Sequence, residues 1–176
     1  CSPDSVSISI YGKEYRYMTP KLNRELGIGT VHQTLMLVDT MDVTSNIYMG
    51  NEIVRRPRFL GWLNIKAMKT GALNIIKRLR INIKNVDEKV TYMSGGQRQA
   101  IAIARAIVGN TNVILMDEPT AALGVRETHD VIELIKRFRE ENAAVLLISH
   151  NMQDVFALAD RITVLRLGHT VAPVNP

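Results

Sequence analysis

Val113-Ile114-Leu115-Met116-Asp117-Glu118 is an apolar run that ends in two carboxylates. A short apolar run of this kind is typical of a strand in the middle of a parallel sheet, where both faces are covered. In open α/β sheets, ligands bind just outside the carboxyl ends of the strands. The run therefore predicts a parallel sheet with a functional site at its edge, to which Asp117 and Glu118 contribute.

Asp117 and Glu118 are suited to metal-assisted phosphate chemistry. One carboxylate can hold Mg²⁺, directly or through water, as a hard oxygen ligand. The other can orient and polarise a water molecule for attack on a phosphate. A lone Asp-Glu pair is usually an exposed acidic turn, but the apolar run before this pair and Pro119-Thr120 after it favour a site.

Strand-like and helix-like segments alternate along the rest of the chain. We expect a β-hairpin from 7–11 and 14–18, a buried strand at 28–32, another at 144–148, a closing strand at 162–167, and helices at 19–27, 42–49, 60–81, 97–108, 126–141 and 154–159. This alternation predicts an α/β domain with a mostly parallel sheet. We place a helical insertion at about residues 42–94, within a core made of about 1–41 and 95–176.

Two further polar residues follow predicted strands. His150 comes after the strand at 144–148, where its imidazole could hydrogen-bond a phosphate and respond to its loss. Gln33 comes after the strand at 28–32, and its amide could bridge a metal or water and the loop behind it. The ordinary alternatives are a structural histidine and a solvated loop residue.

Ser94-Gly95-Gly96 stands directly before a predicted helix that begins near Gln97. Free backbone N–H groups, a hydroxyl and the positive end of a helix together favour an anion. A plain capped helix start is the alternative. Gln97-Arg98 and the helix rich in alanine and isoleucine that follows favour the anion site.

Composition fits one domain with its own core. The chain has 176 residues, of which 46% are hydrophobic. Its longest unbroken apolar run, Ala143–Ile148, is far too short to span a bilayer. A single cysteine, Cys1, excludes an internal disulfide and is compatible with a reducing cytosol. We find no secretory signal and no initiator methionine at the start, and we expect a truncated beginning.

Positive charge is concentrated in residues 51–90. That segment holds ten lysines and arginines against three acids, a net +7, whereas the whole chain carries +5. It is either a solvated helix face or a surface that meets anionic lipid or nucleic acid. Aromatic residues are 5% of the chain and do not alternate with the basic ones, which argues against stacking on single-stranded nucleic acid.

Together these motifs resemble the ATP-binding subunit of an ABC transporter. The resemblance rests on five motifs in the family's order: the Q-loop at Val31-His32-Gln33, the signature at Tyr92-Met93-Ser94-Gly95-Gly96-Gln97-Arg98-Gln99, the Walker B strand at 113–118, the D-loop at Ala121-Ala122-Leu123-Gly124 and the H-switch at Ser149-His150. It implies a P-loop NTPase-like α/β fold with an ABC-type helical subdomain.

Four stretches resemble the sugar-importer branch, of the ribose, xylose, galactose and fructose type. They are Thr120 to Val125, where Gly124 replaces the commoner aspartate, Asp42 to Gly50, Ser149 to Met152, and Asp160 to Ile162. The resemblance implies an ATPase that energises carbohydrate import from the cytoplasmic face of the cell membrane. Its implied partners are a second ATP-binding domain in a head-to-tail pair, transmembrane permease subunits and, indirectly, a solute-binding protein.

The resemblance also implies a role for each site residue, with ATP and Mg²⁺ as cofactors. The implied sets are Glu118, His150 and Gln33 for catalysis, Asp117 and Gln33 for the metal, and Ser94, Gly95, Gly96, Gln97, Asp117 and Gly124 for nucleotide binding. Glu118 would polarise the water and His150 would contact the γ-phosphate. The signature would contact a γ-phosphate held by the partner domain, and Gln33 would link the site to the permease.

One expected motif is missing. A phosphate-binding loop needs the pattern Gly-x-x-x-x-Gly-Lys-Ser/Thr, and the only Gly-Lys pair, Gly12-Lys13, lacks its other members. We therefore expect a partial domain without its Walker A strand and helix, inactive as an isolated chain. Two alternatives stay open: a non-catalytic module that lends its signature to a partner, and a soluble ABC ATPase that acts on nucleic acid.

Overall fold

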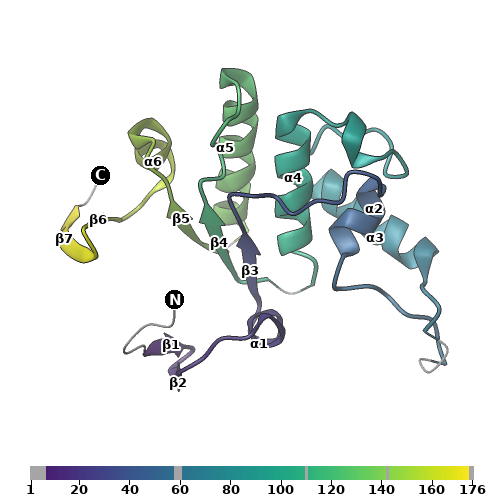
Figure 1. The fold of residues 1–176 in the computed structure, drawn as a ribbon, viewed down its shortest axis with the longest axis horizontal. Coiled ribbons are helices and arrows are strands. Elements are labelled where there is room, and N and C mark those ends of the chain that lie inside the picture. The colour runs from purple at the N-terminus through teal and green to yellow at the C-terminus, as the bar shows by residue number, and fades with distance from the viewer. Residues whose placement is uncertain (1–6, 58–60, 110, 142, 175–176) are drawn as a thin grey trace.

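The computed structural model describes residues 7–57, 61–109, 111–141 and 143–174. At its centre is a three-stranded parallel sheet in the order β3-β4-β5, flanked by helices α4 and α5 (Figure 1). Helices α2 and α3 lie beyond α4, and two-stranded antiparallel ribbons lie towards each terminus. This arrangement confirms the predicted α/β class with a mostly parallel main sheet.

The elements follow one another in the alternation that the sequence predicts. Their bounds are β1 Ile8–Ile10, β2 Lys13–Tyr15, α1 Pro20–Glu25, β3 Ile28–Val31, α2 Val43–Tyr48, α3 Ile65–Arg78, the 3₁₀ helix η2 Val90–Tyr92, α4 Gly95–Ala106, β4 Val113–Asp117, α5 Val125–Glu140, β5 Ala144–Ile148, α6 Met152–Leu158, β6 Ile162–Arg166 and β7 His169–Val174.

Polar side chains fix where the helices begin. Thr19, Asp42 and Ser94 each accept a hydrogen bond from a backbone N–H in the first turn of α1, α2 and α4. Such caps satisfy donors that a helix start otherwise leaves unpaired. The predicted starts of these helices are therefore correct to within two residues.

Helix α4 contributes to two hydrophobic clusters. Its Ile103 joins a cluster with the sheet and with Phe138 of α5, whereas its Ile101 joins a second cluster with α2 and α3. Gly29 of β3 permits the close packing of α4 on the sheet, because a Cβ there would lie 2.2 Å from the carbonyl oxygen of Ala106. A domain boundary at residue 94 stays a prediction.

The helix predicted at 60–81 is wrong at its start. Leu60 lies outside the described residues, and residues 61–64 are not helical. The backbone here pairs with the preceding segment instead: Arg55 N–H donates to Trp62 O at 2.8 Å, and Asn64 N–H donates to Ile53 O at 2.6 Å. The Asn64 side chain then caps α3, so the helix begins at Ile65.

The strand predicted at 144–148 is confirmed in its bounds, but the prediction that it is buried is wrong. Val145 and Leu147 pack against the first cluster, but Leu146 and Ile148 are 59% and 57% exposed. Side chains alternate between the two faces of a strand, and among the described residues only one face of β5 is covered. The apolar run alone did not distinguish one covered face from two.

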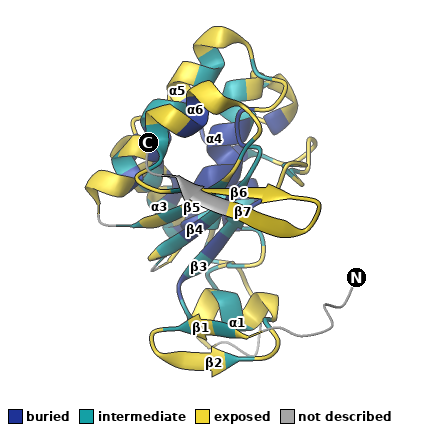
Figure 2. Ribbon diagram, turned by 90° about the vertical axis from the view of Figure 1, so that its left-hand side faces the viewer, coloured by how far each residue is buried: buried dark blue, intermediate teal, exposed yellow. Residues whose placement is uncertain are grey.

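Strand β6 does not close the parallel sheet. It pairs antiparallel with β7, an element that we did not predict, in a ribbon of its own. Figure 2 shows β6 as largely exposed. Within the described part of the chain, no helix has the length and apolar character needed to cross a membrane.

Candidate functional site

Glu118 and His150 meet at the carboxyl edge of the sheet. Parallel pairing of β4 with β5 sets Asp117 opposite Ile148, so the residues that follow these two strands are neighbours. The Glu118 N–H donates to Ile148 O at 2.9 Å, and the His150 N–H donates to Glu118 Oε1 at 3.1 Å. Glu118 Oε1 also lies 2.7 Å from His150 Nδ1. The structure thus joins the two strand ends through one carboxylate.

Glu118 adopts an unusual backbone conformation. Its φ of 50° lies in the left-handed region, which residues other than glycine rarely occupy. Such strain persists where surrounding contacts fix the backbone, and it is concentrated at functional sites. The Glu118 side chain is only 16% exposed, whereas that of His150 is 83% exposed. The carboxylate is therefore held in place and the imidazole is open to solvent.

The same contact affects the protonation of His150. A hydrogen bond to Glu118, and then the charge of that carboxylate, raise the pKa of His150 above its ordinary value of 6.5. A raised pKa means that folding favours the protonated imidazole. Its contribution to stability is complete below pH 6.5 and is lost as the pH rises through the higher folded value. Because the ring is exposed, solvent screens the contribution.

We expect an NMR titration of the full-length protein to give His150 a pKa above 6.5. Replacing Glu118 by Gln removes the charge and should return the pKa of His150 towards that value. An unaltered His150 titration in the Glu118→Gln protein would contradict the pairing.

Asp117 and Gln33 lie at the same edge of the sheet. Asp117 ends β4, and its neighbour Met116 pairs with Val31, two residues before Gln33. Gln33 is exposed, whereas Asp117 is half-buried. The three strand ends therefore present one amide, two carboxylates and one imidazole along a single edge.

Ser94 forms a reciprocal cap at the start of α4. The Ser94 N–H donates to Gln97 Oε1 at 2.9 Å, and the Gln97 N–H donates to Ser94 Oγ at 3.3 Å. The Gln97 amide nitrogen also donates to Asn82 O at 2.7 Å. Gln97 is thereby committed to supporting the turn, while the N–H groups of Gly95 and Gly96 stay outside this cap.

Glu127 of α5 connects this turn to the loop that precedes α5. Its Oε1 accepts the Gly96 N–H at 3.2 Å, and its Oε2 accepts the Gly124 N–H at 3.4 Å. Hydrogen bonds from Gly96, then from the Ser94 hydroxyl, and then from Gly124 lower the pKa of Glu127. The side chain is therefore a charged carboxylate at neutral pH, seated on the positive end of α4.

Gly95 and Gly96 permit this close packing. A Cβ on Gly96 would lie 3.1 Å from Cβ of Glu127, and a Cβ on Gly95 would lie 3.2 Å from a methyl of Leu123. Contacts this short force one neighbour to move. The absence of a Cβ at both glycines therefore accommodates the close approach of α5, whose Glu127 accepts the Gly96 N–H.

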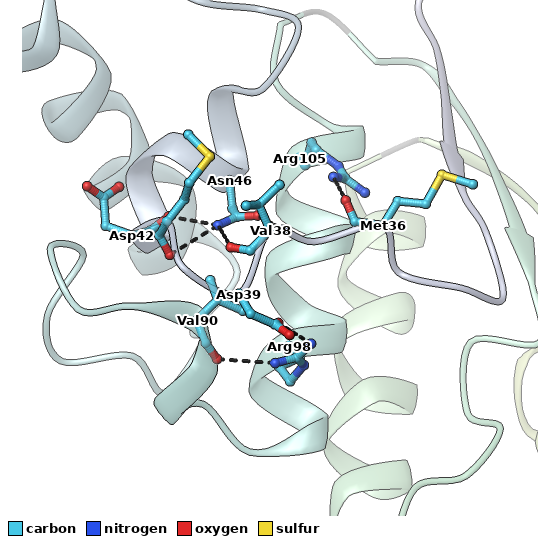
Figure 3. A network of polar contacts seen from close by, with 9 residues as sticks. Met36, Val38, Asp39, Asp42, Asn46, Val90, Arg98 and Arg105 are labelled. Carbon is cyan, nitrogen blue, oxygen red and sulfur yellow. Dashed lines mark hydrogen bonds and ion pairs between the residues drawn. The ribbon is translucent and has the colours of Figure 1, made fainter.

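Two arginines of α4 hold the segment that follows Gln33 (Figure 3). Arg105 donates to Leu35 O at 2.5 Å and to Met36 O at 2.8 Å. Arg98 forms an ion pair of 2.6 Å with Asp39. Buried Asn46 of α2 binds the same segment through the N–H and C=O of Val38. The helix that starts with Ser94 is thus fastened to the segment after Gln33.

A buried polar pair fixes the turn after Glu118. The Thr120 hydroxyl donates to Asp154 of α6 at 2.6 Å, and both side chains are buried. Since α6 begins directly after His150 and Asn151, this bond ties the two strand ends together a second time. Burying an ionisable group requires such a partner.

The sequence profile of the ABC transporter family matches residues 1–121. The chain belongs to this family. Its curated relatives include sugar-import ATP-binding proteins, which confirms both the family resemblance and its sugar-importer branch.

Three relatives illustrate the branch. The fructose import ATP-binding protein FrcA of Rhizobium meliloti is 41% identical over 99% of the chain, which spans 69% of that protein. The xylose/arabinose import protein XylG of Sulfolobus acidocaldarius is 37% identical over 96% of the chain and 66% of its own length. The ribose import protein RbsA of Bacillus subtilis is 38% identical over 98% of the chain, but the chain spans only 34% of it.

Solved structures agree on the fold. The ATP-binding cassette MJ0796 superposes with a TM-score of 0.77 at 22% identity, over 99% of this chain and 75% of that one. That cassette is described as dimeric, in one case in a post-hydrolysis state bound to ADP and Pi. At this identity the likeness supports the ABC cassette fold alone.

The ABC motifs form two groups in the structure. Glu118 and His150 touch directly, with Asp117 and Gln33 along the same edge, whereas the signature turn contacts Gly124 through Glu127. Among the described residues, no hydrogen bond or ion pair joins the two groups. Three polar residues that shape these groups, Glu127, Asp154 and Asp39, were not among the predicted site residues. The spacing of Gly124 and Glu127 fits a helix cap, but nothing local indicates contact with the signature.

Phosphate and Mg²⁺ fit these groups differently. The carboxylate on the signature turn is itself an anion that accepts bonds from Ser94 and Gly96, so the turn accommodates negatively charged oxygens. Of the described residues, no three His, Cys, Asp or Glu side chains form a metal cage. Mg²⁺ is normally bound by one or two carboxylates together with phosphates and water. Asp117 at the sheet edge suits that mode.

Proposed function

We propose that the full-length protein hydrolyses ATP to drive carbohydrate import. The observation that carries this proposal is the Glu118 carboxylate, held by strained backbone at the end of β4 and bonded to His150 at the end of β5. Relatives with 37–41% identity over nearly the whole chain are import proteins for fructose, xylose/arabinose and ribose. Their names support the class of transported solute.

Glu118 would orient and polarise the attacking water. An ionised carboxylate that is fixed by its neighbours can accept a proton from water as the bond to phosphorus forms. His150, exposed beside it, would donate a hydrogen bond to the γ-phosphate, and its raised pKa favours the protonated form for that task. Asp117 and Gln33 would hold Mg²⁺, which when bound neutralises charge on the phosphates.

Two such domains would pair head to tail. Ser94, Gly95 and Gly96 would then bind the γ-phosphate of a nucleotide held by the partner domain, while Gln97 and Gly124 would support the site from its two sides. The dimeric description of MJ0796 supports pairing in general terms. In this arrangement each hydrolytic site would use residues from both domains.

The helical part of the chain would face the permease on the cytoplasmic side of the membrane. We assign this role to about residues 42–94, with the α/β core in about 1–41 and 95–176. The net +7 of residues 51–90 supports a surface near a membrane protein. Lys66 and Lys77 on α3 and Lys84 after it are exposed, whereas Lys69 is paired with Asp87.

Reversing Lys66, Lys77 and Lys84 to Glu tests the function together with its partner. In the full-length protein we expect co-purification with the permease to fall severalfold, while basal ATP hydrolysis stays unchanged. The reason is that like charges across an interface repel and slow association. Pull-down of the permease and phosphate release are measured on the same samples.

A control protein carries the same number of reversals elsewhere. Lys13, Arg16 and Arg166 are exposed on or beside the two antiparallel ribbons, and their reversal should leave permease binding intact. If affinity for DNA or RNA falls in the first protein while permease binding does not, the partner is nucleic acid. That result would contradict carbohydrate import.

A further inference from the structure

Glu127 occupies hydrogen-bond donors of the signature turn that a phosphate would need. Two groups that could receive a phosphate lie beside this carboxylate: the Gly96 N–H donates to it at 3.2 Å, and the Ser94 hydroxyl is near enough to lower its pKa. The same carboxylate accepts the N–H of Gly124, in the loop that follows Glu118 and Thr120. One side chain therefore holds the donors of two turns.

A phosphate and this carboxylate would compete. Both are anions, both need the Ser94 hydroxyl and the Gly96 N–H, and both are attracted by the positive end of α4. Little room is left beside Gly96. A Cβ atom added to this glycine would lie 3.1 Å from Cβ and 3.2 Å from Cγ of Glu127. The carboxylate must therefore move before phosphate can take both donors.

We propose that Glu127 is a positioning residue. It holds the signature turn in shape while no phosphate is bound, and it releases the Ser94 hydroxyl and the Gly96 N–H when phosphate binds. This inference rests on the proposed function. In the absence of nucleotide, the Glu127 carboxylate occupies the place of the phosphate, so the signature turn keeps its conformation. The charged Glu127 side chain has to move away whenever phosphate binds to the turn. The cost of this movement weakens the nucleotide-driven pairing of the two domains.

The Glu127→Gln substitution removes the negative charge of the side chain but keeps its size and its hydrogen bond to the turn. The amide oxygen of Gln can still accept the Gly96 N–H, but the negative charge is gone and a phosphate displaces it more easily. We expect the MgATP concentration that half-saturates domain association to fall about two- to fivefold, the range that exposed charge interactions produce. Glu127→Ala removes shape as well as charge, so its half-saturating concentration should exceed that of the Glu127→Gln protein.

The measurement is light scattering of the full-length protein as MgATP is added, with Glu118→Gln present throughout to prevent turnover. Glu140→Gln is the matched control, since Glu140 is an exposed acid at the far end of α5. Its half-saturating concentration should equal that of the parent. Melting temperatures are recorded for each protein, because a purely structural role would lower them without tightening association.

The outcomes separate this inference from the proposed function. If MgATP associates neither the parent nor the Glu127→Gln protein, the proposed function is wrong and the inference falls with it. If both associate at the same MgATP concentration, or the Glu127→Gln protein needs more, only the inference is overturned. A Glu127→Ala protein that associates as tightly as the Glu127→Gln protein would overturn the shaping role.

Discussion

Replacing Glu118 by Gln in the full-length protein should reduce steady-state ATP hydrolysis by about a hundredfold or more. General-base catalysis contributes about 10²- to 10⁴-fold to enzymatic rates. The Gln side chain keeps the size of Glu and can still accept the His150 N–H, but it cannot take a proton from water. ATP binding should survive, because the substitution removes a negative charge beside an anionic ligand. Phosphate release and nucleotide binding are measured separately.

Glu14→Gln provides the control for this experiment. Glu14 is an exposed acid of the N-terminal hairpin, and its replacement should leave turnover unchanged. Undiminished hydrolysis in the Glu118→Gln protein would show that another group activates the water. Loss of ATP binding instead of turnover would place Glu118 in nucleotide binding rather than in catalysis.

Phe138→Ala should lower the free energy of unfolding by about 3–5 kcal/mol. Phe138 is the largest fully buried side chain among the described residues, 1% exposed, and it joins α5 to the sheet and to α4. Its removal takes away apolar contacts and leaves a cavity that rigid neighbours fill only in part. Because the total free energy of unfolding of a native protein is about 5–15 kcal/mol, this loss is a large fraction of it. Urea unfolding of the full-length protein gives the value.

Phe138→Leu is the matched variant, because it keeps most of the buried volume. A swap of that kind usually costs less than about 1.5 kcal/mol. The difference between the two variants isolates the cavity. Equal losses in both would mean that Phe138 acts through its ring alone, and losses below about 1 kcal/mol in the Phe138→Ala protein would contradict its central place in the core.

Much of the fold was predictable because local patterns coincided with tertiary packing. The stripe of Val131, Leu134, Ile135 and Phe138 on α5 is buried as its helical spacing predicts. The caps at Thr19, Asp42 and Ser94 stand close to the predicted helix starts. The meeting of Glu118 with His150 also followed from sequence, since parallel strands bring their carboxyl ends to one edge.

Other features depend on contacts that no local pattern contains. The start of α3 depends on backbone pairing between Ile53 and Asn64, and the exposed face of β5 depends on which elements cover it. Asp154 and Glu127 act across 34 and 31 residues of chain. A residue's partner at such a separation is set by the packing of helices, which spacing along the sequence does not specify.

The arginine clamp of α4 has a consequence for sequence divergence. Arg105 binds the carbonyl oxygens of Leu35 and Met36, so it recognises backbone that every amino acid possesses. The side chains of Thr34 and Met36 are exposed and take no part in that anchorage. The side chain at position 34 can therefore change, and with it the surface offered to a partner, without loss of this anchorage, whereas the left-handed φ of 49° at Met36 restricts what can replace it.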